Sequence, residues 1–303
     1  MFNTRTSSEK VKIDFITYLK SFFNLMKPRV MSLVIFTCVV GLLIAPAKVN
    51  YLDAIFSILA VALGSGAAGA LNMWYESDLD SLMSRTCLRP IPTGKLTRKQ
   101  AFIFGVSTSI ISVLALYFFS NLVSALILLT TILFYVFVYT IWLKRKTPQN
   151  IVVGGAAGAL PPVIGWTIAT GGISLEPIIL FLIIFIWTPS HFWALSLYKT
   201  EDYKNAKIPM LPITSGINVT KLNIFIYSVL LFPAILAPFF LNYFSFFYLS
   251  ISGSLGVYYM YICYKLFKYK SSRSEKKMAK HIFVFSILFL FLIFTSILID
   301  SLI

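Results

Sequence analysis

The chain has 303 residues, of which 58% are hydrophobic and only 12% are charged, and its formal net charge is +15. A soluble domain carries about 25% charged residues, so this composition excludes a water-soluble protein and requires lipid to cover much of the surface. The three cysteines, Cys38, Cys87 and Cys263, are far apart and form no C-x-x-C pair, which argues against a disulfide framework or a zinc site.

Residues 1–29 are predicted to form a cytoplasmic segment at the membrane surface. Basic residues interrupt any apolar core and no small-residue cleavage site follows, so the segment is not a secretory signal. Apolar side chains recur at helical spacing on one face between Phe15 and Met26, while polar residues lie mostly elsewhere. This pattern predicts an amphipathic helix that lies in the membrane interface.

Residues 30–303 are predicted to form one transmembrane domain. A bilayer core of roughly 30 Å needs about 20 apolar residues in a helix, and nine stretches meet this requirement. Their approximate limits are 30–47, 52–71, 101–119, 122–142, 151–170, 177–197, 222–241, 245–264 and 281–300. The breaks at 119–122 and 241–245 are short, so each flanking pair could instead be one kinked helix. The predicted fold class is an all-α polytopic membrane protein with nine transmembrane helices around a central cavity.

Positive charge gathers on one side of these nine helices. If the N-terminus is cytoplasmic, the segments on the inner side contain 25 of the 26 Lys and Arg residues, and only Lys48 lies outside. These segments are 1–29, 72–100, 143–150, 198–221 and 265–280. Cytoplasmic loops retain positive charge, so the N-terminus is predicted inside and Ile303 outside. Topology therefore explains the positive charge, and no nucleic-acid partner is expected.

Five of the eleven acidic residues follow apolar helices on the predicted cytoplasmic side: Glu76, Asp78, Asp80, Glu201 and Asp202. Asn72, Glu76 and Asp80 are spaced i, i+4, i+8, so one helix face presents all three. Oxygen ligands on one face suit a hard cation such as Mg²⁺, and the Arg and Lys residues that follow suit a diphosphate. A solvated loop that pairs its own charges is the alternative. The second acidic pair, after another apolar span, favours the magnesium–diphosphate site.

The motifs around these residues resemble the UbiA superfamily of intramembrane prenyltransferases, and within it the protohaem IX farnesyltransferases. The segments that carry the resemblance are Lys27-Pro28-Arg29-Val30, Asn72-x-x-x-Glu76-x-x-x-Asp80, Arg85-x-x-x-Arg89-Pro90, Leu143-Lys144-Arg145, Pro161-Pro162, and His191-Phe192-Trp193 with Asp202-Tyr203. The family usually has Asp at position 76 and Arg at position 77, where this chain has Glu76 and Ser77. Residues 30–303 are accordingly expected to be a UbiA-like prenyltransferase domain.

The resemblance implies a magnesium-dependent transfer of farnesyl from farnesyl diphosphate to a vinyl group of haem B, giving haem O with a hydroxyethylfarnesyl side chain. The expected location is the bacterial plasma (inner) membrane, with multiple spans and cytoplasmic active-site loops. Expected partners are haem B, farnesyl diphosphate, membrane lipid, and a haem A-forming enzyme or terminal oxidase that receives the product. The alternatives are a prenyltransferase acting on a quinone precursor, an ion or substrate transporter, and a non-catalytic assembly factor.

The resemblance also implies roles for individual residues. Asn72, Glu76, Asp80 and Asp202 are expected to hold Mg²⁺ and to act in catalysis. Substrate contacts are expected from Arg29, Arg85, Arg89, Lys144, Arg145, Lys199, His191 and Trp193, and a cavity lining from Trp166, Trp187 and Tyr139. His191 lies about 16 Å deeper than Asp202 along a helix, where a polar ring is costly unless it is paired or functional. It is expected either to contact the haem or to be a satisfied packing residue.

Overall fold

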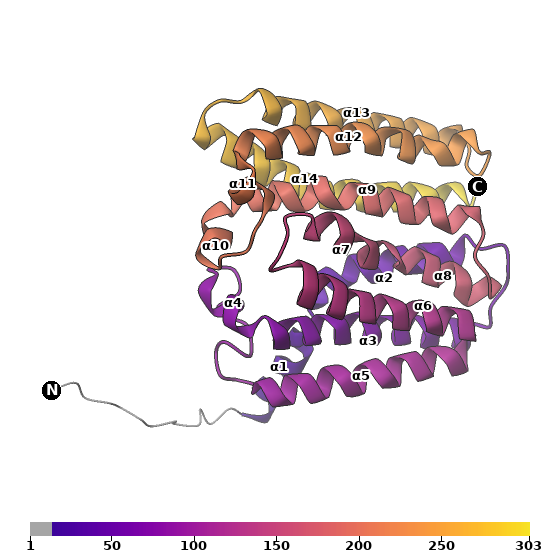
Figure 1. Cartoon of the computed structure of the whole chain (residues 1–303). Coiled ribbons are helices and arrows are strands. Elements are labelled where there is room, and N and C mark those ends of the chain that lie inside the picture. The colour runs from indigo at the N-terminus through magenta and orange to yellow at the C-terminus, as the bar shows by residue number, and fades with distance from the viewer. Residues whose placement is uncertain (1–13) are drawn as a thin grey trace.

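The computed structural model describes residues 14–303, and every regular element in that range is a helix (Figure 1). In chain order these are α1 (Phe15–Leu25), α2 (Pro28–Leu43), α3 (Tyr51–Tyr75), α4 (Ser77–Leu82), α5 (Arg98–Phe119), α6 (Leu122–Leu133), the π-helix η1 (Phe134–Leu143), α7 (Asn150–Ala159), α8 (Pro161–Thr170), α9 (Leu175–Tyr198), α10 (Thr200–Asn205), α11 (Leu211–Thr214), α12 (Gly216–Phe240), α13 (Phe246–Lys268) and α14 (Ser272–Asp300). The predicted all-α class is confirmed. Residues 1–13 of the predicted N-terminal segment, with Arg5, Lys10 and Lys12, lie outside the described residues.

Within the described residues, eight helical stretches are long and apolar enough to cross a membrane. They are α3, α5, α6 with η1, α7 with α8, α9, α12, α13 and α14. A ninth candidate is α1 followed by α2, which are bent by 50° relative to each other. Each predicted stretch corresponds to one of these candidates. The two uncertain pairs are separate helices, since α5 ends before α6 begins and α12 ends before α13 begins.

The two largest of the four hydrophobic clusters are centred on α9, α12, α13 and α14 and on α2, α3, α6 and α8. Helices α2 and α8 approach each other with almost no space between their backbones. A Cβ atom on Gly165 would lie 1.9 Å from the carbonyl oxygen of Cys38, and one on Gly41 would lie 2.1 Å from that of Pro162. Small residues permit this close approach, which is how helices in lipid gain packing contacts.

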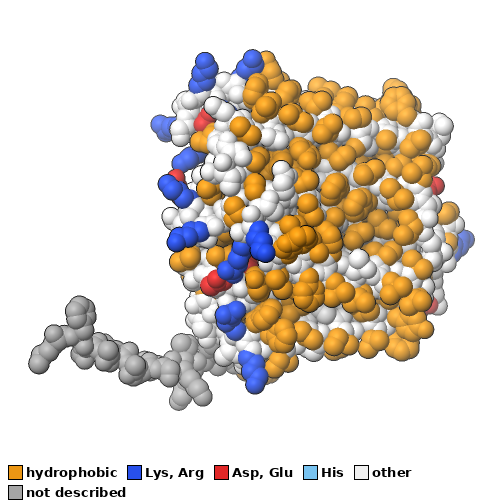
Figure 2. Space-filling view, in the orientation of Figure 1, with side chains coloured by type: hydrophobic (Ala, Val, Ile, Leu, Met, Phe, Trp, Pro, Cys, Tyr) orange, Lys and Arg blue, Asp and Glu red, His pale blue; other side chains and the backbone are white. Residues whose placement is uncertain are grey.

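The surface is divided into a broad apolar belt and a basic end (Figure 2). Large apolar side chains are exposed along the belt, as shown by Ile110 and Phe118 on α5 and Ile287 on α14. Lys and Arg side chains gather at the end of the bundle that carries α4 and α10, and the chain finishes at the opposite end (Figure 1). Helix α1 lies at the basic end and exposes apolar residues such as Phe15 and Phe23, as expected of an interfacial helix.

Candidate active site

The first acidic group, Asn72, Glu76 and Asp80, lies where α3 ends and α4 begins, at the basic end of the bundle. Helix α3 stops at Tyr75, and Glu76 connects it to α4. The N–H of Glu76 nevertheless donates to the carbonyl of Asn72 (2.9 Å), and the N–H of Asp80 donates to that of Glu76 (2.8 Å). The helical spacing therefore continues across the break. All three side chains are at most 3% exposed, so the predicted residues share one buried face.

Each side chain of the first acidic group contacts a cation from elsewhere in the chain. The pairs are Lys27 with Asn72 (2.6 Å), Lys144 with Glu76 (2.5 Å) and Arg89 with Asp80 (2.7 Å). A buried carboxylate is stable only when it is paired and hydrogen-bonded, so these contacts make the burial possible. Lys144 and Arg89, which were predicted as substrate contacts, therefore form ion pairs with two of the predicted metal ligands, Glu76 and Asp80.

Helix η1 places two polar side chains against the first acidic group. It has the wide turn of a π-helix, since the N–H of Lys144 donates to the carbonyl of Tyr139 (3.0 Å), five residues earlier. Thr140 Oγ1 accepts a hydrogen bond from Asn72 Nδ2 (3.0 Å), which fixes the amide with its oxygen toward Lys27. Such π-turns are frequent at functional sites. One helix therefore both orients Asn72 and supplies the ammonium group at Glu76.

The second acidic group, Glu201 and Asp202 on α10, is joined to the first through the loop that follows α4. Ser84 Oγ lies 2.9 and 2.8 Å from the two carboxylate oxygens of Asp202 and donates to that carboxylate. In the same loop, Thr86 Oγ1 donates to the carbonyl of Asp80 (3.0 Å). Glu201 is exposed, and Asp202 is half-buried. The two predicted acidic groups therefore lie at the same end of the bundle.

Asp78 and Arg145 form a more exposed ion pair beside the first acidic group. Arg145 donates from both terminal nitrogens to the two carboxylate oxygens, at 3.0 and 2.8 Å. Partial burial by itself raises the pKa of Asp78, but hydrogen bonds from Arg145 and the backbone outweigh it and lower the pKa below its ordinary value. Asp78 therefore stays ionised and holds Arg145 near the site.

The oxygen ligands present fit a magnesium ion that is shared with a diphosphate. Across residues 14–303, no three His, Cys, Asp or Glu side chains lie close enough together to form a metal cage by themselves. Mg²⁺ is usually held by one or two carboxylates, with water and substrate phosphates in the other positions. Glu76 Oε1 is buried and has no hydrogen-bond partner in the described structure. It is therefore an available oxygen ligand within the first acidic group.

A polar cavity of about 240 Å³ opens beside Arg89, between α1 and the loop after α4. Its polar lining comes from Arg85, Arg89, Lys95, Ser21 and Asn24. Arg89 therefore both pairs with Asp80 and lines this cavity. Arg85, a predicted substrate contact, is brought to the same place.

The sequence alone did not identify Lys27 as a site residue, whereas it did predict a substrate contact from Arg29. In the structure, Lys27 lies at the junction of α1 and α2 with φ of 53°, a left-handed conformation that is uncommon outside glycine. Its ammonium group contacts Asn72. Arg29 is exposed and forms no ion pair with any residue that the structure describes. The usable signal was Pro28, which commonly begins a helix and so places the preceding lysine at the junction.

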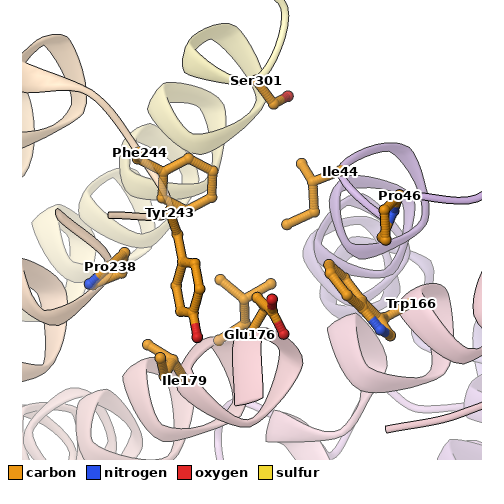
Figure 3. A pocket seen from close by; sticks show the side chains of 10 residues that line it. Ile44, Pro46, Trp166, Glu176, Ile179, Pro238, Tyr243, Phe244 and Ser301 are labelled. Carbon is orange, nitrogen blue, oxygen red and sulfur yellow. The ribbon is translucent and has the colours of Figure 1, made fainter. Parts of the chain in front are cut away.

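A second cavity, of about 250 Å³, lies at the opposite end of the bundle (Figure 3). Its lining includes Trp166, Glu176, Tyr243 and Ser301, and Glu176 is the one charged residue among those that line it. None of the predicted metal ligands or basic substrate contacts lies here. Trp166, predicted as a cavity-lining residue of the reaction site, therefore belongs to a different cavity.

His191 and Trp193 lie on α9, several turns away from the second acidic group. His191 is 7% exposed and hydrogen-bonds through Nδ1 to Ser286 Oγ (2.6 Å). Trp193 is 2% exposed and meets Tyr227 edge-on (5.2 Å), and its Nε1 has no partner within the described residues. Both side chains are thus enclosed by the helices that form the α9–α14 half of the bundle.

These features agree with a known family. Residues 34–296 match the sequence model of the UbiA prenyltransferase family. The chain belongs to the UbiA prenyltransferase family. Among relatives in this family, the protohaem IX farnesyltransferase of Pelagibacter ubique is 60% identical, over 99% of this chain and 99% of its own length.

Solved UbiA-type structures share the fold. A digeranylgeranylglyceryl phosphate synthase structure aligns with a TM-score of 0.77 and 18% identity, over 94% of this chain and 99% of the other. A UbiA homologue from Archaeoglobus fulgidus bound to GPP and Mg²⁺ aligns with a TM-score of 0.65 and 17% identity, over 91% and 99%. At such low identity these two likenesses establish the UbiA-like fold alone. The family membership, together with the helical spans, makes the chain an all-helical, multi-pass membrane prenyltransferase.

Proposed function

We propose that the chain transfers the farnesyl group of farnesyl diphosphate to a vinyl group of protohaem IX (haem B), giving haem O. The observation that carries this proposal is the 60% identity, over 99% of both chains, with a protohaem IX farnesyltransferase. The buried oxygen ligands and surrounding cations at the end of α3 support the diphosphate half of the reaction.

The diphosphate is bound at the basic end, between the two acidic groups. When held by Asn72, Glu76, Asp80 and Asp202, Mg²⁺ supplies positive charge that stabilises the departing diphosphate. The cations that contact these ligands, Lys27, Lys144 and Arg89, donate to diphosphate oxygens once the substrate is present. Arg85 and Arg145 add positive charge around them. The ion pair of Arg145 with Asp78 is more exposed than those of Lys144 and Arg89, so Arg145 contributes less than these two cations.

The farnesyl chain and the porphyrin lie in the apolar interior. Loss of diphosphate leaves an allylic cation, which water would consume before the vinyl carbon attacks it. Aromatic side chains exclude water there, and the ring face of Tyr139, next to Lys144, is one that can stabilise a cation. Addition of water to the porphyrin side then gives the hydroxyethylfarnesyl group.

The basic end faces the cytoplasm of the bacterial inner membrane, because it gathers nearly all Lys and Arg residues of the sequence. The product passes to a haem A-forming enzyme or a terminal oxidase. Cysteine labelling of inverted and right-side-out vesicles tests the orientation. An impermeant maleimide should label Cys87, at the basic end, only in inverted vesicles, and a cysteine in place of Ser301 only in right-side-out vesicles. The reverse pattern would contradict the orientation.

The reaction is tested with purified protein, haem B, farnesyl diphosphate and Mg²⁺, followed by mass analysis of the haem. The expected result is haem that has gained one farnesyl group and one hydroxyl group, because the water that adds to the porphyrin side loses a proton. A prenylated quinone precursor with unmodified haem would instead indicate a different UbiA-type acceptor. Ion flux without prenyl transfer would indicate a transporter, although a transporter places its charges near the bilayer midplane, and the acidic groups here lie at one end of the bundle.

A further inference from the structure

The imidazole of His191 is held in one plane by neighbouring aromatic rings. Trp187, one turn earlier on α9, stacks on it with ring centroids 4.3 Å apart and planes 18° apart. Phe283 of α14 also stacks on it, at 4.8 Å and 27°. The indole Nε1 of Trp187 donates to the backbone carbonyl of Ser286 (3.0 Å), which ties this stack to α14. The ring cannot rotate without breaking these contacts.

The hydrogen bonds of Ser286 determine which nitrogen of His191 is free. Ser286 Oγ lies 2.6 Å from His191 Nδ1 and 2.7 Å from the carbonyl oxygen of Phe283. A serine hydroxyl has one proton, and when that proton is donated to Phe283, Oγ accepts from Nδ1–H. Nε2 then carries a lone pair, no residue in the described part of the chain hydrogen-bonds to it, and it is not among the fully enclosed unpaired atoms there. An unpaired nitrogen so deep in a membrane bundle is costly unless it binds a ligand.

Two lysines lie nearer the basic end, Lys199 directly after the last residue of α9 and Lys280 on α14. Tyr198 follows His191 by seven residues, so it shares its face of α9 and lies about 10 Å closer to that end. Nζ of Lys199 lies 5.2 Å from the Tyr198 ring centroid, and Nζ of Lys280 on α14 lies 5.7 Å from it. Neither lysine forms an ion pair within residues 14–303. Both ammonium groups are therefore available to an anionic ligand.

We propose that this α9–α14 seam, formed by His191, Tyr198, Lys199, Lys280 and Ser286, binds the iron porphyrin. Nε2 of His191 ligates the iron, and the two lysines bind the propionates. The inference rests on the proposed function, which supplies haem as the acceptor. Neutral imidazole is a common axial ligand of haem iron, and the two propionates leave one edge of the ring. The axial rise of about 10 Å from His191 to Tyr198, whose ring both lysines approach, is of the same scale as the distance from iron to propionate.

Ser286 acts as a positioning residue in this site. Histidines that ligate metals usually donate their other ring N–H to a fixed acceptor, which sets the tautomer and the ring orientation. Ser286 Oγ is such an acceptor, and its backbone carbonyl also fixes Trp187. With the propionates at the basic end, the opposite edge of the porphyrin lies in the water-free interior.

Porphyrin binding to the purified full-length protein tests the inference without turnover. Wild-type protein titrated with haem should give the absorption spectrum of histidine-ligated iron. His191→Ala should abolish that spectrum and lower haem affinity by about tenfold or more, while affinity for metal-free protoporphyrin IX, which has no iron to ligate, should stay unchanged. Imidazole added to His191→Gly should restore the ligated spectrum. His281→Ala is the matched control, since His281 is exposed on α14, and it should change nothing.

An unchanged haem spectrum and affinity in His191→Ala would overturn iron ligation. If that variant also still forms farnesylated haem, the proposed function stands without the ligand. If wild-type protein binds no haem and forms no farnesylated haem, the proposed function fails together with the inference. Retained binding of metal-free porphyrin shows that the variant is folded.

The positioning and propionate contacts have separate readouts. Ser286→Ala should lower haem affinity several-fold and shift the haem spectrum, without changing binding of the metal-free ring. Ser286→Thr keeps the hydroxyl, so it should retain the wild-type haem affinity and spectrum. Lys199→Gln and Lys280→Gln should weaken haem and metal-free protoporphyrin alike, but not protoporphyrin dimethyl ester, which lacks free carboxylates. An equal loss with the dimethyl ester would overturn the propionate contacts.

Discussion

The two acidic groups differ in how their charge is compensated. Glu76 and Asp80 in the first group are 3% exposed, and each holds a basic side chain in an ion pair. In the second group, Glu201 is exposed and Asp202 is half-buried, and within residues 14–303 the Asp202 carboxylate accepts hydrogen bonds only from the hydroxyl of Ser84. Neither of these two forms an ion pair in the part of the chain that the structure describes.

This difference follows from burial and indicates different tasks. A buried carboxylate needs a partner, so the first group carries its cations with it and positions them before substrate arrives. A half-exposed carboxylate is solvated and needs no cationic partner, so Asp202 keeps its negative charge available for a cation that comes with the substrate. We infer that the first group builds the diphosphate site and that Asp202 completes it.

Asp80→Ala should give the largest loss. It removes a proposed metal ligand and leaves the guanidinium of Arg89 without its carboxylate, so farnesylation of haem should fall by about 10²- to 10³-fold. Asp80→Asn is the control for folding, because an amide keeps the volume and still accepts from Arg89. It should retain the wild-type unfolding temperature and still lose most activity. Wild-type activity in Asp80→Asn would show that the Asp80 carboxylate is not a metal ligand.

Asp202→Asn should weaken magnesium rather than disturb the fold. The carboxamide can still accept from Ser84 but carries no charge, so we expect the apparent affinity for Mg²⁺ to fall by about 10- to 100-fold. Activity measured against Mg²⁺ concentration gives this shift, and saturating Mg²⁺ should recover part of the rate. Glu201→Gln is the matched control, since the Glu201 carboxylate is exposed beside Asp202. It should leave the dependence of activity on Mg²⁺ concentration unchanged. Equal effects of the two variants would contradict a distinct role for Asp202.

The parts of this site that the sequence predicted are those fixed by short-range spacing. The spans followed from the length of apolar stretches, and Asn72, Glu76 and Asp80 followed from helical periodicity, which persists across the break at Glu76. The partners were not predictable in this way. Lys27 lies 45 residues from Asn72 in sequence, and Lys144 lies 68 residues from Glu76, so their pairing depends on how the helices pack.

Glu76→Asp tests whether charge or reach matters in the first group. Aspartate keeps the negative charge that Lys144 requires but is one methylene shorter, so activity should fall by less than about tenfold, or 1.4 kcal/mol. Glu76→Gln keeps the reach and loses the charge, and it should be the more damaging of the two. Rates of haem farnesylation at saturating Mg²⁺ rank the variants. The opposite ranking would show that Glu76 Oε1 acts through its position and not its charge.

Arg145→Ala should have the smallest effect, because its ion pair with Asp78 is the most exposed at the site. The side chains are 36% and 55% exposed, and exposed pairs contribute about 1 kcal/mol or less, so activity should change by less than about fivefold. Lys144→Ala is the comparison, since Lys144 lies on the buried Glu76 and should lose far more activity. A loss in Arg145→Ala as large as in Lys144→Ala would mean that Arg145 leaves Asp78 and binds the diphosphate directly. The contrast between buried and exposed charge would then no longer separate the cations that hold substrate from those that merely surround it.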